Sequence, residues 1–316
     1  MTPDLGAVTV SSVVGSIPWI GILIALVGAV FLAFGAQLQH TGVEIVEERY
    51  GSGEKSGLTV AQLLRLLQRP SWVIGTLLLG LAILAQLTAL TFAPLIVVQP
   101  IGVVALVITA LLNARVSKVR LHRKAIRAII YCVGGVGIFV SVAAIYAVEP
   151  IVGDRELLIV LILLGIVLVV LGLAFAFFRK HLTAIFYIVA AGVLYGFVAT
   201  LAKVVINRLF NGDVEWLTLS CVAALLAAMI LGAYFVQTAY SVGSPDLVVA
   251  GLTVVDPLVA VAIGIFVLGE AAETPVWAFF VWAAAGAIAV FGVLQLARNH
   301  PQTHRRIAPG ETPALR

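Results

Sequence analysis

Residues 253–270 read TVVDPLVAVAIGIFVLGE, a helix-length apolar run that contains one aspartate and one proline. A helix crosses a bilayer core with about 20 apolar residues, and a carboxylate near the centre costs about 2.5–3.5 kcal/mol on insertion scales. Such a residue usually faces a cavity or a partner, and a proline leaves the carbonyl one turn earlier without its helical donor. Asp256 and Pro257 therefore predict a polar point inside a membrane span.

The composition of the whole chain places this run in a membrane protein. Of the 316 residues, 62% are hydrophobic and 11% are charged, whereas a soluble domain carries roughly 25% charged residues. The runs long enough to span a bilayer cover residues 17–39, 72–93, 95–114, 125–147, 156–178, 182–204, 216–240, 247–268 and 276–296. The sequence thus predicts an all-α polytopic membrane protein with about nine transmembrane helices.

The basic residues between the runs predict the orientation of the chain. An N-terminus outside the membrane puts 16 of the 19 Lys and Arg residues on the cytoplasmic side, as the positive-inside rule requires. Residues 1–16 are then extracytoplasmic, and residues 297–316 are a disordered cytoplasmic tail. The net charge is +4, and the basic residues that produce it lie between the apolar runs, next to the membrane. Nucleic acid is therefore not an expected partner.

A second proline-containing stretch matches the first. Residues 97–111, VVQPIGVVALVITAL, are identical to residues 254–268 at seven of fifteen positions, with Gln99 opposite Asp256 and Pro100 opposite Pro257. Because these stretches occupy the third and eighth runs, they cross the membrane in opposite directions. The match predicts an inverted-topology repeat of four, one and four spans, an arrangement found in many transporters.

These boundaries divide the chain into a first repeat (17–147), a linking span (148–181) and a second repeat (182–296). Within the first repeat, residues 40–71 are too polar to span the membrane. Their last part, LTVAQLLRLLQRP, predicts a helix lying at the cytoplasmic interface. No cofactor is expected, because the sequence contains no CxxC spacing and no Cys/His cluster.

The polar residues of the runs, with the two prolines, are the candidate substrate-binding or coupling residues. For Asp256, capping of a helix break or pairing with one neighbour is the alternative, and for the glutamines it is hydrogen bonding between helices. Lys203, near the outer end of the sixth run, either extends to water or acts as a counter-ion or substrate ligand. The set is Asp256, Pro257, Gln99, Pro100, Gln37, Gln86, Gln237, Tyr240 and Lys203.

The segment DPLVAVAIGIFVLGE, followed by VWAFFVWAAAGAIAVFGVL, resembles the C-terminal signature of the drug/metabolite transporter superfamily. In EamA-like members a proline-containing helix ends in LGE. Within the superfamily, FAPLIVVQPIGVVALVITALL and GVLYGFVATLAKVV are most similar to the NIPA-type magnesium transporters. The resemblance covers residues 182–296 well, whereas the first half has LLNARV where the second has FVLGE. It implies a transporter of ten-helix ancestry that has lost its first helix.

Together these features predict a secondary transporter that moves a small polar or amphipathic metabolite by alternating access. Asp256 would carry a coupling proton or a substrate charge. Two alternatives stay open: a NIPA-like divalent cation transporter with Asp256 as a metal ligand, and a lipid-carrier translocase or non-transporting scaffold. An enzyme is not expected, because HExxH, GxSxG and paired helical aspartates are absent.

The expected partners are the substrate or ion and the lipid bilayer, with a homodimer left open. The high Ala, Val and Gly content of the chain suggests a GC-rich bacterium. The sequence therefore predicts a multi-pass protein of a bacterial inner membrane, with its N-terminus outside and its C-terminus in the cytoplasm.

Overall fold

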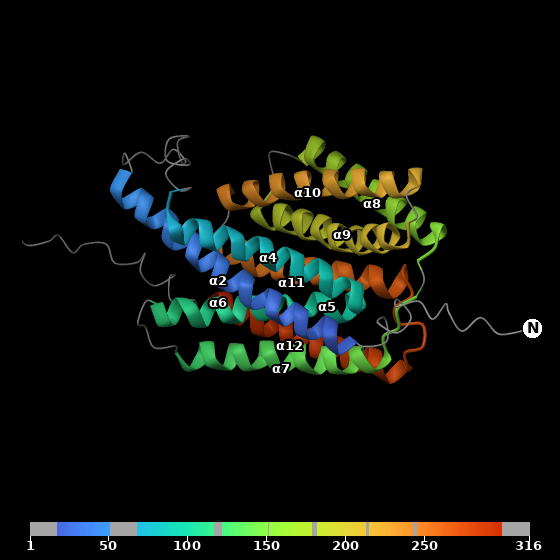
Figure 1. The fold of residues 1–316 in the computed structure, drawn as a ribbon, viewed down its shortest axis with the longest axis horizontal. Coiled ribbons are helices and arrows are strands. Elements are labelled where there is room, and N and C mark those ends of the chain that lie inside the picture. Colours follow the sequence, from blue (N-terminus) through green and yellow to red (C-terminus); the bar gives the residue numbers. More distant parts are fainter. Residues whose placement is uncertain are drawn as a thin grey trace, which may run out of the picture.

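The computed structural model describes residues 18–50, 68–116, 122–150, 152–178, 182–212, 215–242 and 245–298. These residues are helical apart from short connections, and they include no strand. The helices are α2 (Pro18–Tyr50), α4 (Pro70–Phe92), α5 (Leu95–Ile101), α6 (Val103–Val116), α7 (Arg123–Tyr146), α8 (Asp154–Phe178), α9 (Ala184–Asn211), α10 (Trp216–Val242), α11 (Pro245–Phe266) and α12 (Val276–Arg298). They run lengthwise in one bundle (Figure 1).

Within the described part of the chain, nine spans are long and apolar enough to cross a membrane, with α5 and α6 together forming one of them. This confirms the predicted class, a multi-pass all-α membrane protein. The sixth span is longer than predicted and reaches Asn211. The first span ends at Gln39, but its helix continues to Tyr50, so residues 40–50 are helical. Most of the predicted interfacial helix lies outside the described residues.

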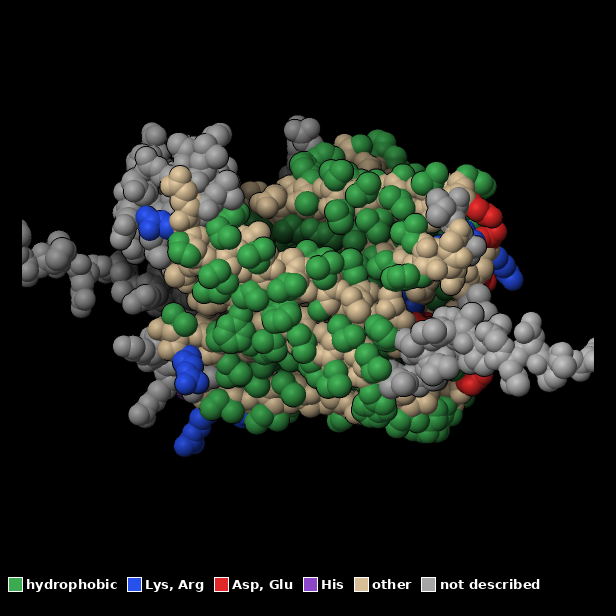
Figure 2. All heavy atoms as spheres, in the orientation of Figure 1, with side chains coloured by type: hydrophobic (Ala, Val, Ile, Leu, Met, Phe, Trp, Pro, Cys, Tyr) green, Lys and Arg blue, Asp and Glu red, His purple; other side chains and the backbone are tan. Residues whose placement is uncertain are grey.

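The sides of the bundle are apolar, as lipid contact requires. Large side chains such as Phe177, Phe266 and Phe280 are 77%, 83% and 73% exposed in the isolated chain. Figure 2 shows green side chains along the sides, with blue and red side chains confined to the two ends. Because a charged group is costly in hydrocarbon, this distribution suits a bundle whose long axis crosses the bilayer.

Local sequence sets where several helices begin. Pro18, Pro70 and Pro245 are the first residues of α2, α4 and α11, a position where the missing N–H of proline costs nothing and its fixed φ is already helical. Pro94 precedes α5 in the same way. The prolines therefore separate successive spans, whereas Pro100 and Pro257 lie inside helices.

The helices pack so that α8, α9 and α10 lie on one side of the bundle and α6, α7 and α12 on the other (Figure 1). Of the first group, α9 approaches α11 very closely. A Cβ atom on Gly192 would lie 2.6 Å from Cβ of Val255, and one on Gly196 would lie 3.0 Å from the carbonyl oxygen of Asp256. Only glycine permits this approach, which places α9 directly against the Asp256 turn of α11.

Candidate functional site

A cavity of about 650 Å³ lies between α2, α4, α5, α6, α9 and α11. Most of its wall is formed by small or apolar side chains. Asp256, which lines it, stands at the middle of the span Leu247–Phe266, so the cavity reaches the centre of the bundle. The polar side chains that line it are Gln86, Gln99, Tyr195, Thr253 and Asp256.

Gln99 lies near the C-terminal end of α5, just before the break between α5 and α6. Pro100 has no N–H to donate to the carbonyl of Ile96, and the backbone tightens there: the N–H of Gly102 donates to the carbonyl of Gln99 over 3.2 Å. The single run predicted over 95–114 is therefore two helices joined at Gly102. The Gln99 side chain is 6% exposed, and its Nε2 has no hydrogen-bond partner.

Asp256 reaches the same cavity from a continuous helix, because Pro257 does not interrupt α11. The side chain is partly buried, and its Oδ1 atom is buried without a hydrogen-bond partner. A buried polar group left unpaired costs about 1–3 kcal/mol, and more if it is charged. The lining of the cavity thus includes two residues with an unsatisfied buried polar atom, one from each of the two matching stretches.

The structure brings Gln86, Gln99, Asp256 and Pro257 together in this cavity. Pro100 instead lines a smaller apolar pocket of about 70 Å³ on the α7–α12 side, which Pro257 also borders.

Three other predicted residues do not line the cavity. Gln37 is partly buried in α2, Gln237 is exposed on α10, and Tyr240 is 39% exposed on the same helix. The structure places these three candidates outside the lining of this cavity, and their role stays a prediction. The periodicity of a helix does not reveal which of its faces meets the other half of the bundle.

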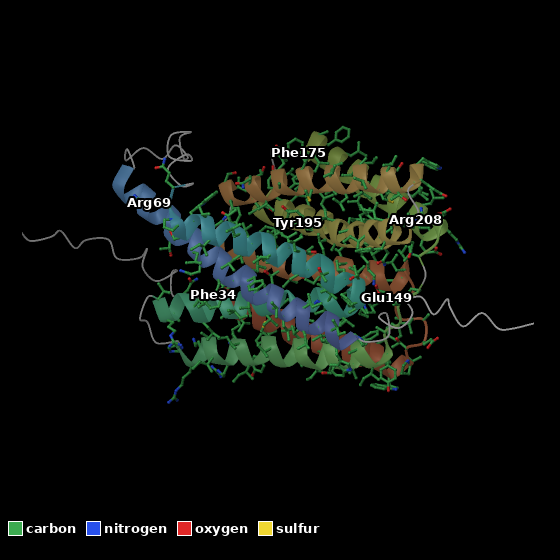
Figure 3. The ribbon with its side chains drawn as sticks, viewed as in Figure 1. Phe34, Arg69, Glu149, Phe175, Tyr195 and Arg208 are labelled. Carbon is green, nitrogen blue, oxygen red and sulfur yellow. The ribbon has the colours of Figure 1, made fainter. Side chains whose placement is uncertain are left out.

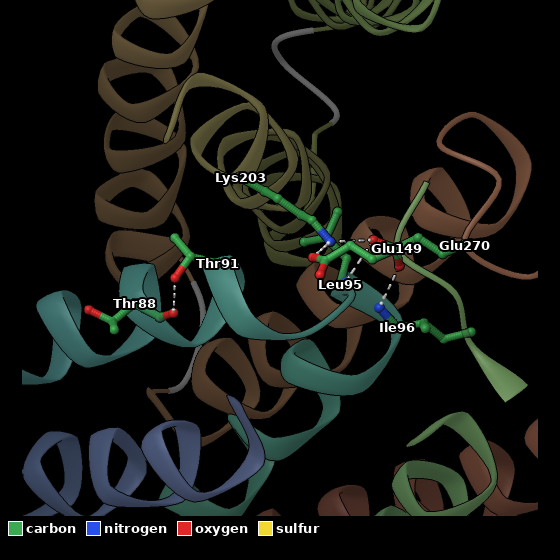
Figure 4. A network of polar contacts seen from close by, with 7 residues as sticks. All are labelled: Thr88, Thr91, Leu95, Ile96, Glu149, Lys203 and Glu270. Atoms are coloured by element: carbon green, nitrogen blue, oxygen red, sulfur yellow. Dashed lines mark hydrogen bonds and ion pairs between the residues drawn. The ribbon is translucent and has the colours of Figure 1, made fainter. Parts of the chain in front are cut away.

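Lys203 does not extend to water, which corrects that interpretation of its position. Its side chain is 2% exposed, and its Nζ lies 2.9 Å from Oε1 of Glu270 and 3.1 Å from Oε1 of Glu149 (Figure 4). Two carboxylates on neighbouring connections hold the ammonium group inside the bundle. Lys203 is therefore the counter-ion of these glutamates and not of Asp256.

Glu270 is the centre of this ion cluster, which we define as Lys203, Glu149 and Glu270. It is fully buried, and its two carboxylate oxygens accept the backbone N–H groups of Leu95 and Ile96 over 2.8 and 2.9 Å. These are the first residues of α5, whose N–H groups have no partner within the helix. Figure 4 shows Glu270 between α5 and the Lys203 side chain. The cluster thus ties α5, α9 and two connections together.

Gly269 turns the chain so that Glu270 points inward. Gly269 has a φ of +74°, a left-handed conformation that other residues adopt only with strain. The following N–H, of Glu270, donates to the carbonyl of Gly264 over 2.9 Å, and the carbonyl of Glu270 accepts from Val148 over 2.8 Å. The LGE segment therefore has a structural role: its glycine makes the turn and its glutamate caps α5.

Replacing Gly269 with alanine is expected to lower the free energy of unfolding by about 1–2 kcal/mol, the cost of a left-handed non-glycine residue. Thermal unfolding of the purified protein in detergent measures the loss. Gly165→Ala is the control, because a Cβ there meets nothing within 4 Å and alanine favours a helix. A Gly269→Ala protein as stable as the wild type would contradict the turn described above.

Four residues of the site have no assigned role in the sequence prediction: Tyr195, Thr253, Glu149 and Glu270. Thr253 precedes Asp256 by three residues and so shares its helix face, which is a signal that the sequence does contain. Tyr195 lies on α9 between α10 and α4 (Figure 3), and Glu149 lies in the α7–α8 connection. The residues around Tyr195, Glu149 and Glu270 are distant from them in the sequence, so only the packing of the helices identifies these three as parts of the site.

The chain matches no protein-family model. No solved structure matches it either. An uncharacterized protein of Corynebacterium glutamicum is similar, with 27% identity over 287 residues that cover 89% of this chain and 95% of that protein. The similarity extends over nearly the whole of both chains and brings no assigned activity with it.

Proposed function

We propose that this protein is a secondary transporter that moves a small polar or amphipathic metabolite across a membrane by alternating access. The observation that carries the proposal is the cavity of about 650 Å³, which is lined by Gln99 and Asp256, two residues that each have a buried polar atom without a partner. Transporter sites are commonly built near the bilayer midplane from interrupted helices of two related halves. A scaffold has no use for a cavity with unsatisfied polar groups, which lowers its stability.

Helix packing supports an inverted repeat of four, one and four spans, as in the drug/metabolite transporter superfamily that the sequence resembles. The first span, α2, packs on the second, α4, and the corresponding sixth span, α9, packs on the seventh, α10. The third span, α5 with α6, contacts the eighth span, α11. The fourth span, α7, packs on the ninth span, α12. These pairings are the ones that an inverted repeat predicts, with α8 as the linking span.

The ion cluster supports a structure that is closed at one end. With the N-terminus outside, the start of α5, the end of α9 and the α11–α12 connection all lie at the extracytoplasmic end. The cluster joins them by contacts of 2.8–3.1 Å. Alternating access requires such an end to open and close while the central site stays in place.

The charge distribution supports this orientation. Arg69, Arg115, Arg123, Lys124 and Arg127 lie at the ends of α4, α6 and α7 that face away from the ion cluster. Figure 3 places Arg69 at one end of the bundle and Glu149 at the other. Because basic residues gather on the cytoplasmic side, we place the cluster outside and propose a bacterial inner membrane as the location.

An organic solute is favoured over a divalent cation as the cargo. Magnesium is bound through carboxylates, phosphates and water in a near-ideal octahedron. Among the described residues there is no group of three or more His, Cys, Asp and Glu side chains that could hold a metal ion. Asp256 is the single carboxylate among the residues that line the cavity.

Side-specific cysteine labelling tests alternating access without a known substrate. Ala199, which lines the cavity, is replaced by cysteine in a chain whose buried Cys132 and Cys221 are replaced by alanine. A membrane-impermeant thiol reagent is then applied to right-side-out and inside-out vesicles. We expect Ala199→Cys to react from both sides.

Val169→Cys is the matched control, because Val169 lies on α8 and is 61% exposed toward lipid. It should react from neither side. Labelling of Ala199→Cys from one side only, under all conditions, would rule out alternating access and favour a scaffold.

A further inference from the structure

The lining of the cavity contains a single carboxyl group. It belongs to Asp256, and none of the lining residues is Lys, Arg or His. Lys203 directly follows Ala202, a lining residue, but its ammonium group is bound to Glu270 and Glu149. No cation of the lining therefore neutralises Asp256, and the electrostatic potential inside the cavity favours a positively charged ligand.

The other polar groups are arranged to orient such a ligand. Gln99, which lines the cavity, is 6% exposed, and its amide nitrogen is buried without a hydrogen-bond partner. Tyr195 is another lining residue, and aromatic faces attract cations. An unpaired carboxylate, an amide and an aromatic ring in an otherwise apolar wall match a ligand with a cationic group on an apolar body.

The cavity also meets the lipid-facing side of the bundle. Leu32 of α2 and Ile83 of α4 line it and are 43% and 62% exposed. Figure 2 shows the side of the molecule hollowed between α4 and α10, over α9, where Figure 3 places Tyr195. A ligand with an apolar body can therefore reach the cavity from the membrane.

We propose that the cavity binds an amphipathic organic monocation, with its charged nitrogen against Asp256 and its apolar body along α2 and α4. This inference rests on the proposed transport function and specifies the class of its substrate. An anion would face an unneutralised carboxylate, and a neutral solute would leave that carboxylate unpaired. A single positive charge matches the single negative charge of the site.

Three matched probes test the charge preference: benzyltrimethylammonium, its uncharged carbon analogue neopentylbenzene, and the anion phenylmethanesulfonate. Binding to the full chain in lipid nanodiscs is measured by calorimetry, with empty nanodiscs subtracted. We expect the cation to bind at least about tenfold more tightly than either other probe, because a hydrogen bond or contact to a charged group is worth about that factor.

Variants then assign the preference to Asp256. Asp256→Asn should weaken cation binding about 10- to 100-fold and leave neopentylbenzene binding unchanged. Asp256→Glu keeps the charge and should retain the preference. Glu273→Gln removes an exposed acidic residue outside the cavity and should bind as the wild type does. If Asp256→Asn does not fold, the three probes on the wild type together with Asp256→Glu still decide the question.

Equal binding of the three probes, or a cation preference that survives Asp256→Asn, would overturn the inference. Flux measurements distinguish failure of the ligand-class inference from failure of the proposed transport function. Cation binding without movement across proteoliposome membranes supports the ligand class and contradicts transport. Movement of anionic or neutral solutes with no charge preference supports transport and contradicts the ligand class.

Discussion

The Lys203→Met variant is expected to lose about 3–5 kcal/mol of stability, because removing one partner of a buried ion pair leaves an uncompensated charge. Glu270 would remain fully buried with only two backbone N–H groups as partners. Methionine has nearly the length of lysine, so the packing volume is retained and the loss reports the charge. Thermal unfolding of the purified protein in detergent measures it.

Two further variants make this prediction specific to the ion cluster. Adding Glu270→Gln to Lys203→Met removes both charges and should restore part of the lost stability. Lys124→Met, at the exposed start of α7, is the surface control and should change stability by no more than about 0.5 kcal/mol. A Lys203→Met protein that unfolds like the control would show that the ion cluster does not hold α5 and α9 together.

Glu149→Gln should have a smaller effect than Lys203→Met. Glu149 is 21% exposed and contacts Lys203 at the longer distance of 3.1 Å, so solvent screens its charge. Its replacement leaves the Lys203–Glu270 pair of 2.9 Å intact. The order of the two effects is therefore part of the prediction.

The Asp256→Asn variant is expected to reduce coupled transport about 10- to 100-fold, the factor that corresponds to losing a charge-assisted contact. Asparagine has the same shape but can neither carry the charge nor release a proton. Uptake of benzyltrimethylammonium into proteoliposomes with an imposed pH gradient measures the effect. The thermal unfolding curve of the same preparation shows that the variant is folded.

The control variants for this prediction retain either the charge or the cavity. Asp256→Glu keeps a carboxylate and should transport at a measurable rate with the same pH dependence. Gln86→Leu removes a lining amide and should reduce transport less than Asp256→Asn, because no charge is lost. Unchanged coupling in Asp256→Asn would mean that this residue only stabilises the bundle.

The class of the fold could be predicted from the sequence because membrane insertion depends on each segment separately. Every span must satisfy its own backbone hydrogen bonds and present apolar side chains to lipid. For that reason the nine predicted runs match the nine spans found in the described part of the chain. Gln99 and Asp256 were predicted for a related reason: a polar residue in a span is costly enough to need a cavity or a partner.

The tertiary structure decided which polar residues share a space. Gln86 lines the cavity and Gln237 is exposed, although both are glutamines within predicted spans. Lys203 proved to be bound by Glu270 and Glu149, residues 67 and 54 positions away in the sequence. A hydropathy pattern describes the environment of one helix at a time, whereas a cavity and an ion pair depend on the rotation and depth of several helices together. The sequence alone determined the spans and the positions of Gln99 and Asp256 within them, and the packing of α9 against α5 and α11 determined which side chains share the cavity and which form the ion cluster.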